Sequence, residues 1–240
     1  MASLRNNSPG CETGISNSPA DAVTQSTESP QIDIQVSFDR PTHSYSQLEP
    51  PRIFITVTSR ARYPITVYTW RRPLDPKRAL ISNGYIVTDQ ATGDPVRTTY
   101  LMINRMPELR VRGSPDDKYI LTLQPNTPVE LSTGFGRAGG GIKPDPRAIV
   151  ERGWERDEHG NEQKIRRSMQ ATGVDGLEPG HTYSVGLNME SLRGMWWAPV
   201  TRDEILVDHR GKGSYIQEYP WNVDRPLDFR VAEAQIQILD

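Results

Sequence analysis

Two closely spaced runs of alternating residues, 53–58 and 64–70, constrain the fold more than any other part of this sequence. β-Branched and aromatic side chains recur in both runs with the period of two that a pleated strand requires. A short basic stretch separates the runs and can form a turn. The pattern therefore predicts a hairpin of two neighbouring strands at the centre of a β fold.

Similar alternation recurs along the rest of the chain, with turn residues between the runs. It predicts further strands at Gln31–Phe38 and at residues 84–89, 96–103, 119–123, 129–133 and 229–239. Helical character is confined to a short turn at residues 201–206. The 20 prolines and 19 glycines also suit a loop-rich β protein. We predict an all-β fold, an immunoglobulin- or fibronectin-like antiparallel β-sandwich.

The predicted sandwich is a single domain at residues 31–240, preceded by a tail. Residues 1–30 are rich in Ser, Asn, Pro and Thr and have no aromatic residue, so burial cannot offset the entropy that ordering costs. They are predicted to be disordered. The alternating pattern also breaks down at residues 134–180, a glycine- and charge-rich segment. We predict a long polar insertion there, with an exposed hairpin around Gly160.

The strongest topological signal after the two central runs is a turn and strand at residues 177–188. Pro179 and Gly180 are turn residues, and Tyr183 follows them at the spacing of a tyrosine corner. In immunoglobulin-type sandwiches the phenol of this corner hydrogen-bonds to the upstream backbone and fixes the crossing between the sheets. All three residues are therefore predicted to have a structural role.

Composition indicates an ordinary globular protein, with 35% hydrophobic and 24% charged residues and a net charge of −2. No apolar run reaches the roughly 18 residues that a membrane span needs. The first residues lack the apolar core of a secretory signal. The single cysteine, Cys11, cannot form an internal disulfide. These features predict a cytoplasmic protein that makes no contact with membranes.

The familiar catalytic and cofactor motifs lack their required context. Gly134, Gly136 and Gly139 satisfy G-x-G-x-x-G, but glycines and prolines follow where a nucleotide-binding helix would begin. The four histidines lie far apart in sequence, and no pair has the spacing of a helical metal site. The G-x-S-x-G elbow of serine hydrolases is absent too. We therefore predict no catalytic residue, no metal and no cofactor.

Charge is distributed unevenly along the chain, with eleven basic and four acidic side chains in residues 51–112. Such a segment can meet an acidic partner, or it can face the acidic remainder of the same protein. No nucleic-acid-binding motif accompanies the charge, so we predict no nucleic-acid binding.

Within this basic segment Trp70 directly precedes Arg71 and Arg72, and Arg110 and Arg112 follow later. One interpretation makes the tryptophan a core residue of an inner strand and the arginines a solvated rim. The other makes these residues a cationic edge for a partner, because Trp and Arg are enriched in interface hot spots. We take the edge as the predicted binding surface for a protein partner with an acidic surface.

A second aromatic site contains Trp196 and Trp197. Adjacent residues of a strand point to opposite faces, so at most one of them faces the core directly. The other lies under a loop, against the insertion that contains Trp154, or at a binding surface. These three tryptophans are the candidates for a pocket or an exposed aromatic site.

Residues 52–131 also resemble a known group of proteins. The likeness rests on the order of short motifs: Pro-Ile-Thr at 64–66, Thr-Trp at 69–70, Pro-Leu-Asp-Pro at 73–76, Thr-Asp at 88–89, Asn-Arg-Met-Pro at 104–107, Leu-Thr-Leu-Gln-Pro at 121–125 and Val-Glu-Leu at 129–131. This order resembles small fungal immunoglobulin-like β-sandwich proteins of unknown function and, more distantly, the pro-segment of the deuterolysin metallopeptidases. The zinc-binding His-Glu-x-x-His of such peptidases does not follow. The resemblance implies a filamentous-fungal origin and, at most, a binding or inhibitory role.

These observations lead to one expected function and two alternatives. We expect a non-catalytic module that binds a protein partner. The first alternative is a small-molecule-binding protein or cofactor-free enzyme of fungal specialised metabolism, with an apolar pocket beside Trp154, Trp196 or Trp197 and scattered acids for proton transfer. The second alternative is a peptidase inhibitor.

Overall fold

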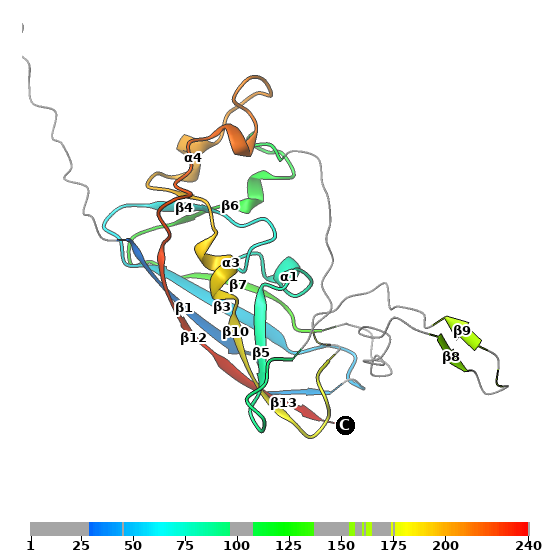
Figure 1. The fold of residues 1–240 in the computed structure, drawn as a ribbon. Coiled ribbons are helices and arrows are strands. Elements are labelled where there is room, and N and C mark those ends of the chain that lie inside the picture. Colours follow the sequence, from blue (N-terminus) through cyan, green and yellow to red (C-terminus); the bar gives the residue numbers. More distant parts are fainter. Residues whose placement is uncertain are drawn as a thin grey trace, which may run out of the picture.

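The structure, a computed structural model of the 240-residue chain, describes residues 29–44, 46–96, 108–136, 154–156, 160, 162–164, 174 and 176–239. Most of the described elements are strands, and the fold is largely β (Figure 1). The strands are β1 (Gln31–Phe38), β2 (Thr42–Ser44), β3 (Arg52–Ser59), β4 (Ile65–Tyr68), β5 (Tyr85–Asp89), β6 (Ile120–Leu123), β7 (Val129–Gly134), β8 (Trp154–Arg156), β9 (Glu162–Lys164), β10 (Thr182–Leu187), β11 (Trp197–Ala198), β12 (Asp228–Ala232) and β13 (Ala234–Leu239). The helices are α1 (Pro76–Ala79), α3 (Met189–Arg193) and α4 (Arg202–Ile205), with 3-10 turns η1 (Asp117–Tyr119) and η2 (Ile216–Glu218).

The first sheet has the strand order β12-β1-β3-β7. β1 and β3 pair antiparallel, with Ile34 opposite Val57, and alternate residues of both strands are buried. This is the burial that their period-two sequences predict, because one face of each strand meets the core. The other face of β3 carries partly exposed residues such as Thr56 and Thr58.

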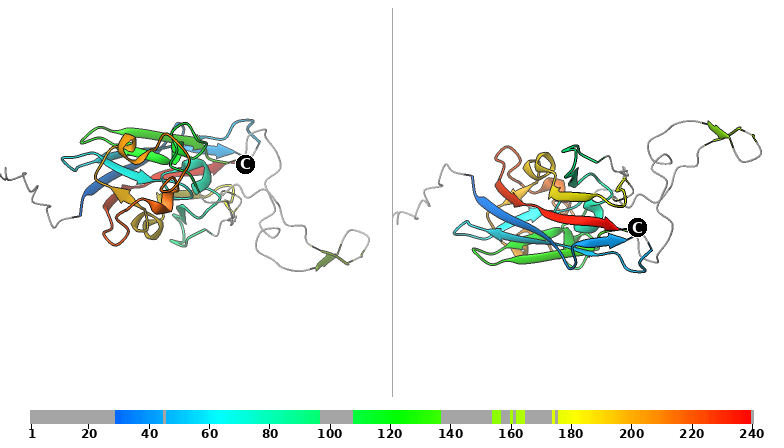
Figure 2. Two further views of the ribbon diagram at one scale, coloured as in Figure 1. Left: turned by 90° about the horizontal axis from the view of Figure 1, so that it is seen from above. Right: turned by 90° about the horizontal axis from the view of Figure 1, so that it is seen from below.

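The second sheet has the order β2-β13-β10-β5. Its inward side chains, among them Val87, Tyr183 and Ile236, belong to the same buried cluster as those of β1 and β3. The two four-stranded sheets therefore share one hydrophobic core, which we call the main cluster. Seen from below, the C-terminal strands (red) lie beside β1 (blue) (Figure 2).

A third sheet, β11-β4-β6, lies with α4 at one end of the molecule (Figure 1). It belongs to a second buried cluster that is rich in aromatic side chains, the aromatic cluster. Its members are Tyr68, Tyr119, Ile120, Ala198, Ile205, Leu206, Ile216 and Trp221, with Trp70, Trp196, Val200 and Tyr219 packed against them. The predicted helical turn at residues 201–206 is α4, and it begins with a capping box in which the Thr201 backbone N–H donates to the Glu204 carboxylate at 2.8 Å.

The predicted hairpin is wrong, although both of its strands exist. β3 pairs with β1 and β7, whereas β4 pairs with β6 and β11 in another sheet. Both edges of β3 are already occupied, so β4 has to pair elsewhere. Every residue of β4 is buried, with Val67 in the main cluster and Tyr68 in the aromatic cluster. β4 thus lies between the two clusters instead of beside β3.

The predicted single strand at residues 229–239 is in fact two strands in two sheets. β12 pairs with β1, the chain passes to the other sheet at Glu233, and β13 pairs with β10. The Glu233 carboxylate accepts a hydrogen bond from the Ser184 hydroxyl of β10 at this crossing. The pairs β1–β12 and β2–β13 are parallel, which corrects the expectation of a purely antiparallel arrangement. Each strand turns alternate residues toward the core, but these positions shift phase at the crossing, from Phe229 and Val231 on β12 to Ile236 and Ile238 on β13.

Several predictions fall wholly or largely on residues outside the described part of the chain. These are the tail at residues 1–30, apart from the last two, the strand at 96–103 beyond Val96, and most of the insertion at 134–180. Within that insertion the predicted hairpin is present around Gly160, where β8 and β9 pair antiparallel. The predicted strands at 84–89, 119–123 and 129–133 correspond to β5, β6 and β7.

His43 of β2 is buried, with 3% of its surface exposed. Burial, aided by the positive charge of Arg40, lowers the pKa of His43 below its ordinary value of 6.5. The unfolded chain therefore takes up the proton first, so this contribution to stability is complete above about pH 6.5 and is lost as the pH falls toward the lowered pKa. Urea unfolding at pH 7.5 and at pH 5 should show a larger loss of stability in the wild type than in His43→Gln. Equal losses in the two proteins would contradict this assignment.

Candidate binding surface

Residues 69–72 form a turn directly after β4. The Arg72 backbone N–H donates to the Thr69 carbonyl oxygen at 2.9 Å, and Arg71, the third residue of the turn, has a φ of 55°. A turn of this kind favours glycine or asparagine at its third position. Among the described residues, every other one with a positive φ is a glycine or an asparagine. Arg71 therefore occupies a backbone position that costs an ordinary side chain about 1 kcal/mol or more.

Trp70 lies at the same turn and stacks with two other side chains. Its ring meets that of Tyr119 edge to face, with 4.7 Å between the centroids. The Arg78 guanidinium of α1 lies 4.1 Å from the centroid of Trp70 and 5.0 Å from that of Tyr119. Asp75 forms an ion pair with this guanidinium, with Arg78 Nη1 3.2 Å from Asp75 Oδ2. Such cation–π packing fixes the orientation of the arginine and keeps its charge close to the ring.

Arg72 lies over the end of α3. Its Nη1 atom is 3.3 Å from the place where a Cβ atom on Gly194 would sit. Burial, together with the positive charge of Arg71, lowers the pKa of Arg72 below its ordinary value. In the part of the chain that the structure describes, no carboxylate is paired with the Arg72 side chain. This half-buried guanidinium is therefore an unneutralised positive charge.

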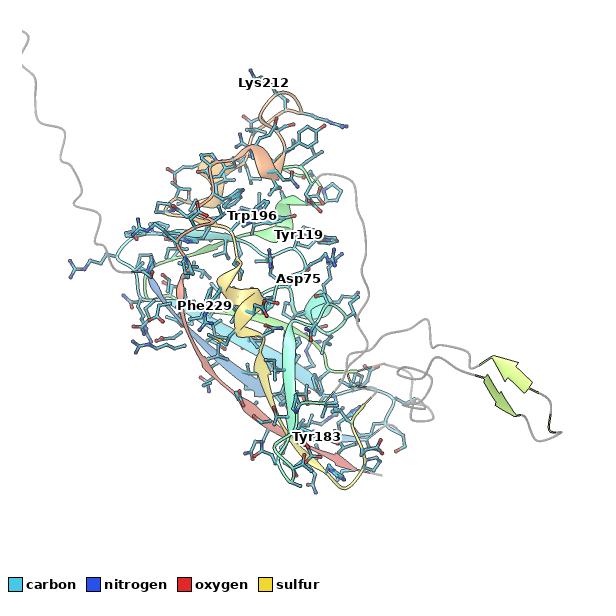
Figure 3. The ribbon with its side chains drawn as sticks, viewed as in Figure 1. Asp75, Tyr119, Tyr183, Trp196, Lys212 and Phe229 are labelled. Carbon is cyan, nitrogen blue, oxygen red and sulfur yellow. The ribbon has the colours of Figure 1, made fainter. Side chains whose placement is uncertain are left out.

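Two lysines extend the positive charge around the turn. Lys77 is exposed on α1, and the exposed Lys118 lies 5.2 Å from the Tyr119 ring. We call the whole set the Trp70 surface: Trp70, Arg71, Arg72, Lys77, Arg78 and Lys118. Asp75 is the acid within it; burial raises the pKa of this carboxyl, and Arg78 and Lys118 oppose the rise. Figure 3 shows Asp75 and Tyr119 on the same side of the molecule, below the loop that carries Lys212.

Arg110 and Arg112, which the sequence assigns to the same edge, have partners inside the protein. The Arg110 guanidinium donates to the backbone oxygens of Ile205 and, at 2.6 Å, of Gly213. Arg112 forms exposed ion pairs with Asp203, at 2.5 Å, and Asp208, at 3.4 Å. These contacts tie α4 and the segment after it to residues 108–112, so we assign both arginines a structural role and leave them out of the Trp70 surface.

The positive charge of residues 51–112 is therefore partly paired with acids inside the protein and partly located at the Trp70 surface. Arg60 pairs with Asp33 at 2.7 Å, and Arg112 pairs with acids that lie much later in the chain. This is the internal neutralisation that the sequence offered as an alternative. At the Trp70 surface, in contrast, no carboxylate of the described residues is paired with the Arg72 side chain.

The two adjacent tryptophans, Trp196 just before β11 and Trp197 within it, pack in different clusters. Trp197 is buried in the main cluster, and its indole Nε1–H donates to the Arg225 carbonyl oxygen at 2.6 Å. Trp196 is half-buried and stacks on Tyr68, with ring centroids 5.9 Å apart. Trp154 lies on β8, and its side chain is outside the described part of the structure.

The tyrosine corner lies at the opposite end of the molecule from Trp196 and Tyr119 (Figure 3). The Glu178 backbone N–H donates to the Tyr183 hydroxyl oxygen at 2.8 Å, which is the hydrogen bond that the sequence predicts. Pro179 and Gly180 form the turn between them, and Gly180 has a φ of 85°. The corner therefore joins the start of β10 to its own upstream backbone.

Beside the corner the structure brings together a carboxylate and an imidazole that sequence reasoning missed. His181 Nδ1 lies 2.6 Å from Asp89 Oδ2 at the end of β5, although the two residues are far apart in sequence. The Ala91 backbone N–H and then His181 lower the pKa of Asp89. Such a pair orients the imidazole ring. Nothing in the local sequence around either residue predicts this contact.

Two open hollows lie on the described surface. One, of about 400 Å³, lies on the outer face of β1, β3 and β12. The other, of about 420 Å³, lies beside His181 and Gly180. Neither is lined by Trp70, Trp196 or Trp197.

The described ranges contain no group of three or more His, Cys, Asp or Glu side chains arranged to hold a metal ion. They also contain no helix that is both long enough and apolar enough to cross a bilayer. The sequence matches no protein-family model, and a search of curated proteins found no significant match. The resemblance to fungal β-sandwich proteins and to the deuterolysin pro-segment therefore stays a prediction.

Proposed function

We propose that this chain is an immunoglobulin-like β-sandwich, one domain over residues 31–240, that binds the acidic surface of a protein partner through the Trp70 surface without catalysis. The observation that carries the proposal is Arg71, a charged side chain at a turn position that favours glycine. Strained backbone in a native protein is found preferentially where a side chain has to be presented for function.

The order of the strands supports the immunoglobulin-like assignment. β1, β3 and β7 neighbour one another as strands A, B and E do in that fold, and β13, β10 and β5 as strands G, F and C. On this correspondence Tyr183 stands on strand F, where the tyrosine corner of such domains is found. The parallel contact of β2 with β13 follows from the first strand crossing between the two sheets.

The chemistry of the Trp70 surface supports an acidic protein as the partner. Trp and Arg are the residues most enriched in interface hot spots, and here they are held in place by stacking before any partner arrives. A half-buried arginine without a described acidic neighbour gains most from a partner that supplies the missing negative charge. The pocket alternative has no such support, because the two hollows lie away from the tryptophans. A peptidase inhibitor would be one kind of protein binder, and the experiment below would recover the peptidase.

Charge reversal at the turn tests this function. Tagged full-length protein is used for affinity capture from its native source, and the variant Arg71→Glu/Arg72→Glu is compared with the wild type. We expect the variant to capture at least about tenfold less of the wild-type partner, because two negative side chains then face the acidic surface of that partner. Rising salt should weaken wild-type capture for the same reason.

Lys212→Glu is the matched control, because this exposed lysine stands on a loop away from Asp75 and Tyr119 (Figure 3). It should capture the same partner as the wild type. The proposal is overturned when the double variant keeps every wild-type partner, or when the wild type captures nothing specific.

A second variant separates function from stability. Arg71→Gly removes the strained side chain, so we expect the free energy of unfolding to rise by about 0.5–1 kcal/mol. The same variant should lose part of the partner binding, because it also removes a charge of the Trp70 surface. Urea unfolding and capture measured on one preparation would check both effects. A loss of stability would show that the interactions of Arg71 within the fold outweigh its backbone strain.

A further inference from the structure

The Arg72 side chain is the most unusual charge in the described part of the protein. Its guanidinium is half-buried and has no paired carboxylate there, and its neighbour along the chain is another arginine. Removing a guanidinium from water without a counter-charge is unfavourable, and a second positive charge beside it adds repulsion. Such an arrangement is stabilised when an anion binds.

Gly194 makes room for this guanidinium. The residue ends α3 with a φ of −83°, a conformation that any amino acid adopts, so the backbone does not require glycine. A Cβ atom at this position would lie 3.3 Å from Arg72 Nη1, closer than most such contacts allow. The absence of a side chain therefore lets Arg72 lie against the end of the helix, where the partial negative charge of the helix end favours a cation.

The number of charges indicates which anion fits. One carboxylate supplies a single negative charge and two acceptor oxygens, which one guanidinium can satisfy. A phosphomonoester carries a charge of about −1.5 to −2 and three acceptor oxygens, which matches two adjacent guanidinium groups. Trp70, with Arg78 stacked on its ring, lies beside the two arginines and offers a flat surface for the residues that flank the phosphate.

We infer that Arg71 and Arg72 form a phosphate-binding site that recognises a phosphorylated side chain of the protein partner. This inference rests on the proposed function and specifies the chemistry of the partner. Arg72 binds the phosphate oxygens through its fork of N–H donors, Gly194 positions Arg72, and Arg71 supplies the second charge.

The test uses two small probes, capped phosphoserine and capped glutamate, titrated into the full-length protein. The guanidinium and indole N–H signals of Arg72 and Trp70 are followed by NMR. We expect capped phosphoserine to bind at least about tenfold more tightly than capped glutamate and to shift the Arg72 signals. Arg72→Lys keeps the charge but removes the fork, so it should lose most of this preference.

Two glycine variants examine the positioning. Gly194→Ala should weaken phosphoserine binding several-fold while leaving the urea midpoint close to that of the wild type, since a flexible arginine side chain can move away. Gly211→Ala is the control, because a Cβ atom there meets nothing within 4 Å, and it should bind as the wild type does.

The outcomes separate this inference from the proposed function. Equal binding of both probes, or no shift of the Arg72 signals by capped phosphoserine, overturns the phosphate site. Affinity capture with Arg71→Glu/Arg72→Glu decides the proposed function independently. Loss of the partner in that variant, together with equal probe binding, would leave a carboxylate-bearing partner as the answer.

Discussion

Replacing Trp197 by alanine is expected to lower the free energy of unfolding by about 3–5 kcal/mol, the largest effect that we predict for a single substitution. The side chain is only 3% exposed and belongs to the main cluster. Its indole N–H also donates to the Arg225 carbonyl oxygen at 2.6 Å, so truncation leaves a cavity and removes the partner of a backbone oxygen. Urea unfolding followed by circular dichroism measures the change.

Trp196→Ala is the matched control for this prediction. The ring is half-buried and stacks on Tyr68 at one face of the aromatic cluster. Its removal should cost less than about 2 kcal/mol, because less surface is returned to water and no indole hydrogen bond is described for it. Equal losses for the two variants would contradict the assignment of the tryptophans to different environments.

The second large effect is expected for Gly84→Ala, just before β5. A Cβ atom at this position would lie 2.6 Å from the Ala79 Cβ and 2.8 Å from the Ala79 Cα, so the backbone of α1 has to move. Overpacking of this kind costs about 1–3 kcal/mol. α1 also carries Arg78, so the stacking of Arg78 on Trp70 should loosen. We therefore expect a change in tryptophan fluorescence in addition to the loss of stability.

Gly211→Ala again serves as the control, because a Cβ atom there has open space around it. Its stability should stay within about 0.5 kcal/mol of the wild type. A stable Gly84→Ala protein with unchanged fluorescence would show that α1 can shift without cost, and the close approach of α1 to β5 would then have no role in holding Arg78.

Local alternation in the sequence was enough to predict most of the strands but not their partners. Residues 31–38 and 53–58 form strands as predicted, since each buries one face. β4 shows the limit of this reasoning: its alternation is intact, yet both faces are buried and it pairs in another sheet. The apolar positions of residues 229–239 shift phase between Val231 and Ile236, where the chain passes from one sheet to the other, and the prediction of one strand overlooked this shift. Pairing depends on contacts between distant segments, which a local pattern does not contain.

The residues of the candidate surface also differ in whether the sequence could identify them. Trp70, Arg71 and Arg72 are adjacent in sequence, so their composition alone indicated a site. Tyr119 and Gly194 contribute through packing between distant segments, and no sequence signal identified them. The internal contacts of Arg110 and Arg112 were missed for the converse reason: their acceptors and acids lie about 90 or more residues later and could not be matched to them beforehand.

The parallel pairs β1–β12 and β2–β13 have a consequence for how this protein folds during synthesis. β1 completes its sheet only with β12, and β2 joins its sheet only through β13. Neither sheet can be completed before β12 and β13 have left the ribosome. Until then β1 and β2 have strand edges without their parallel partners. Folds that depend on such distant pairing form in about milliseconds to seconds, which is slow compared with helical domains. The nascent chain is therefore most exposed to misassembly and to chaperones until β12 and β13 have been synthesised.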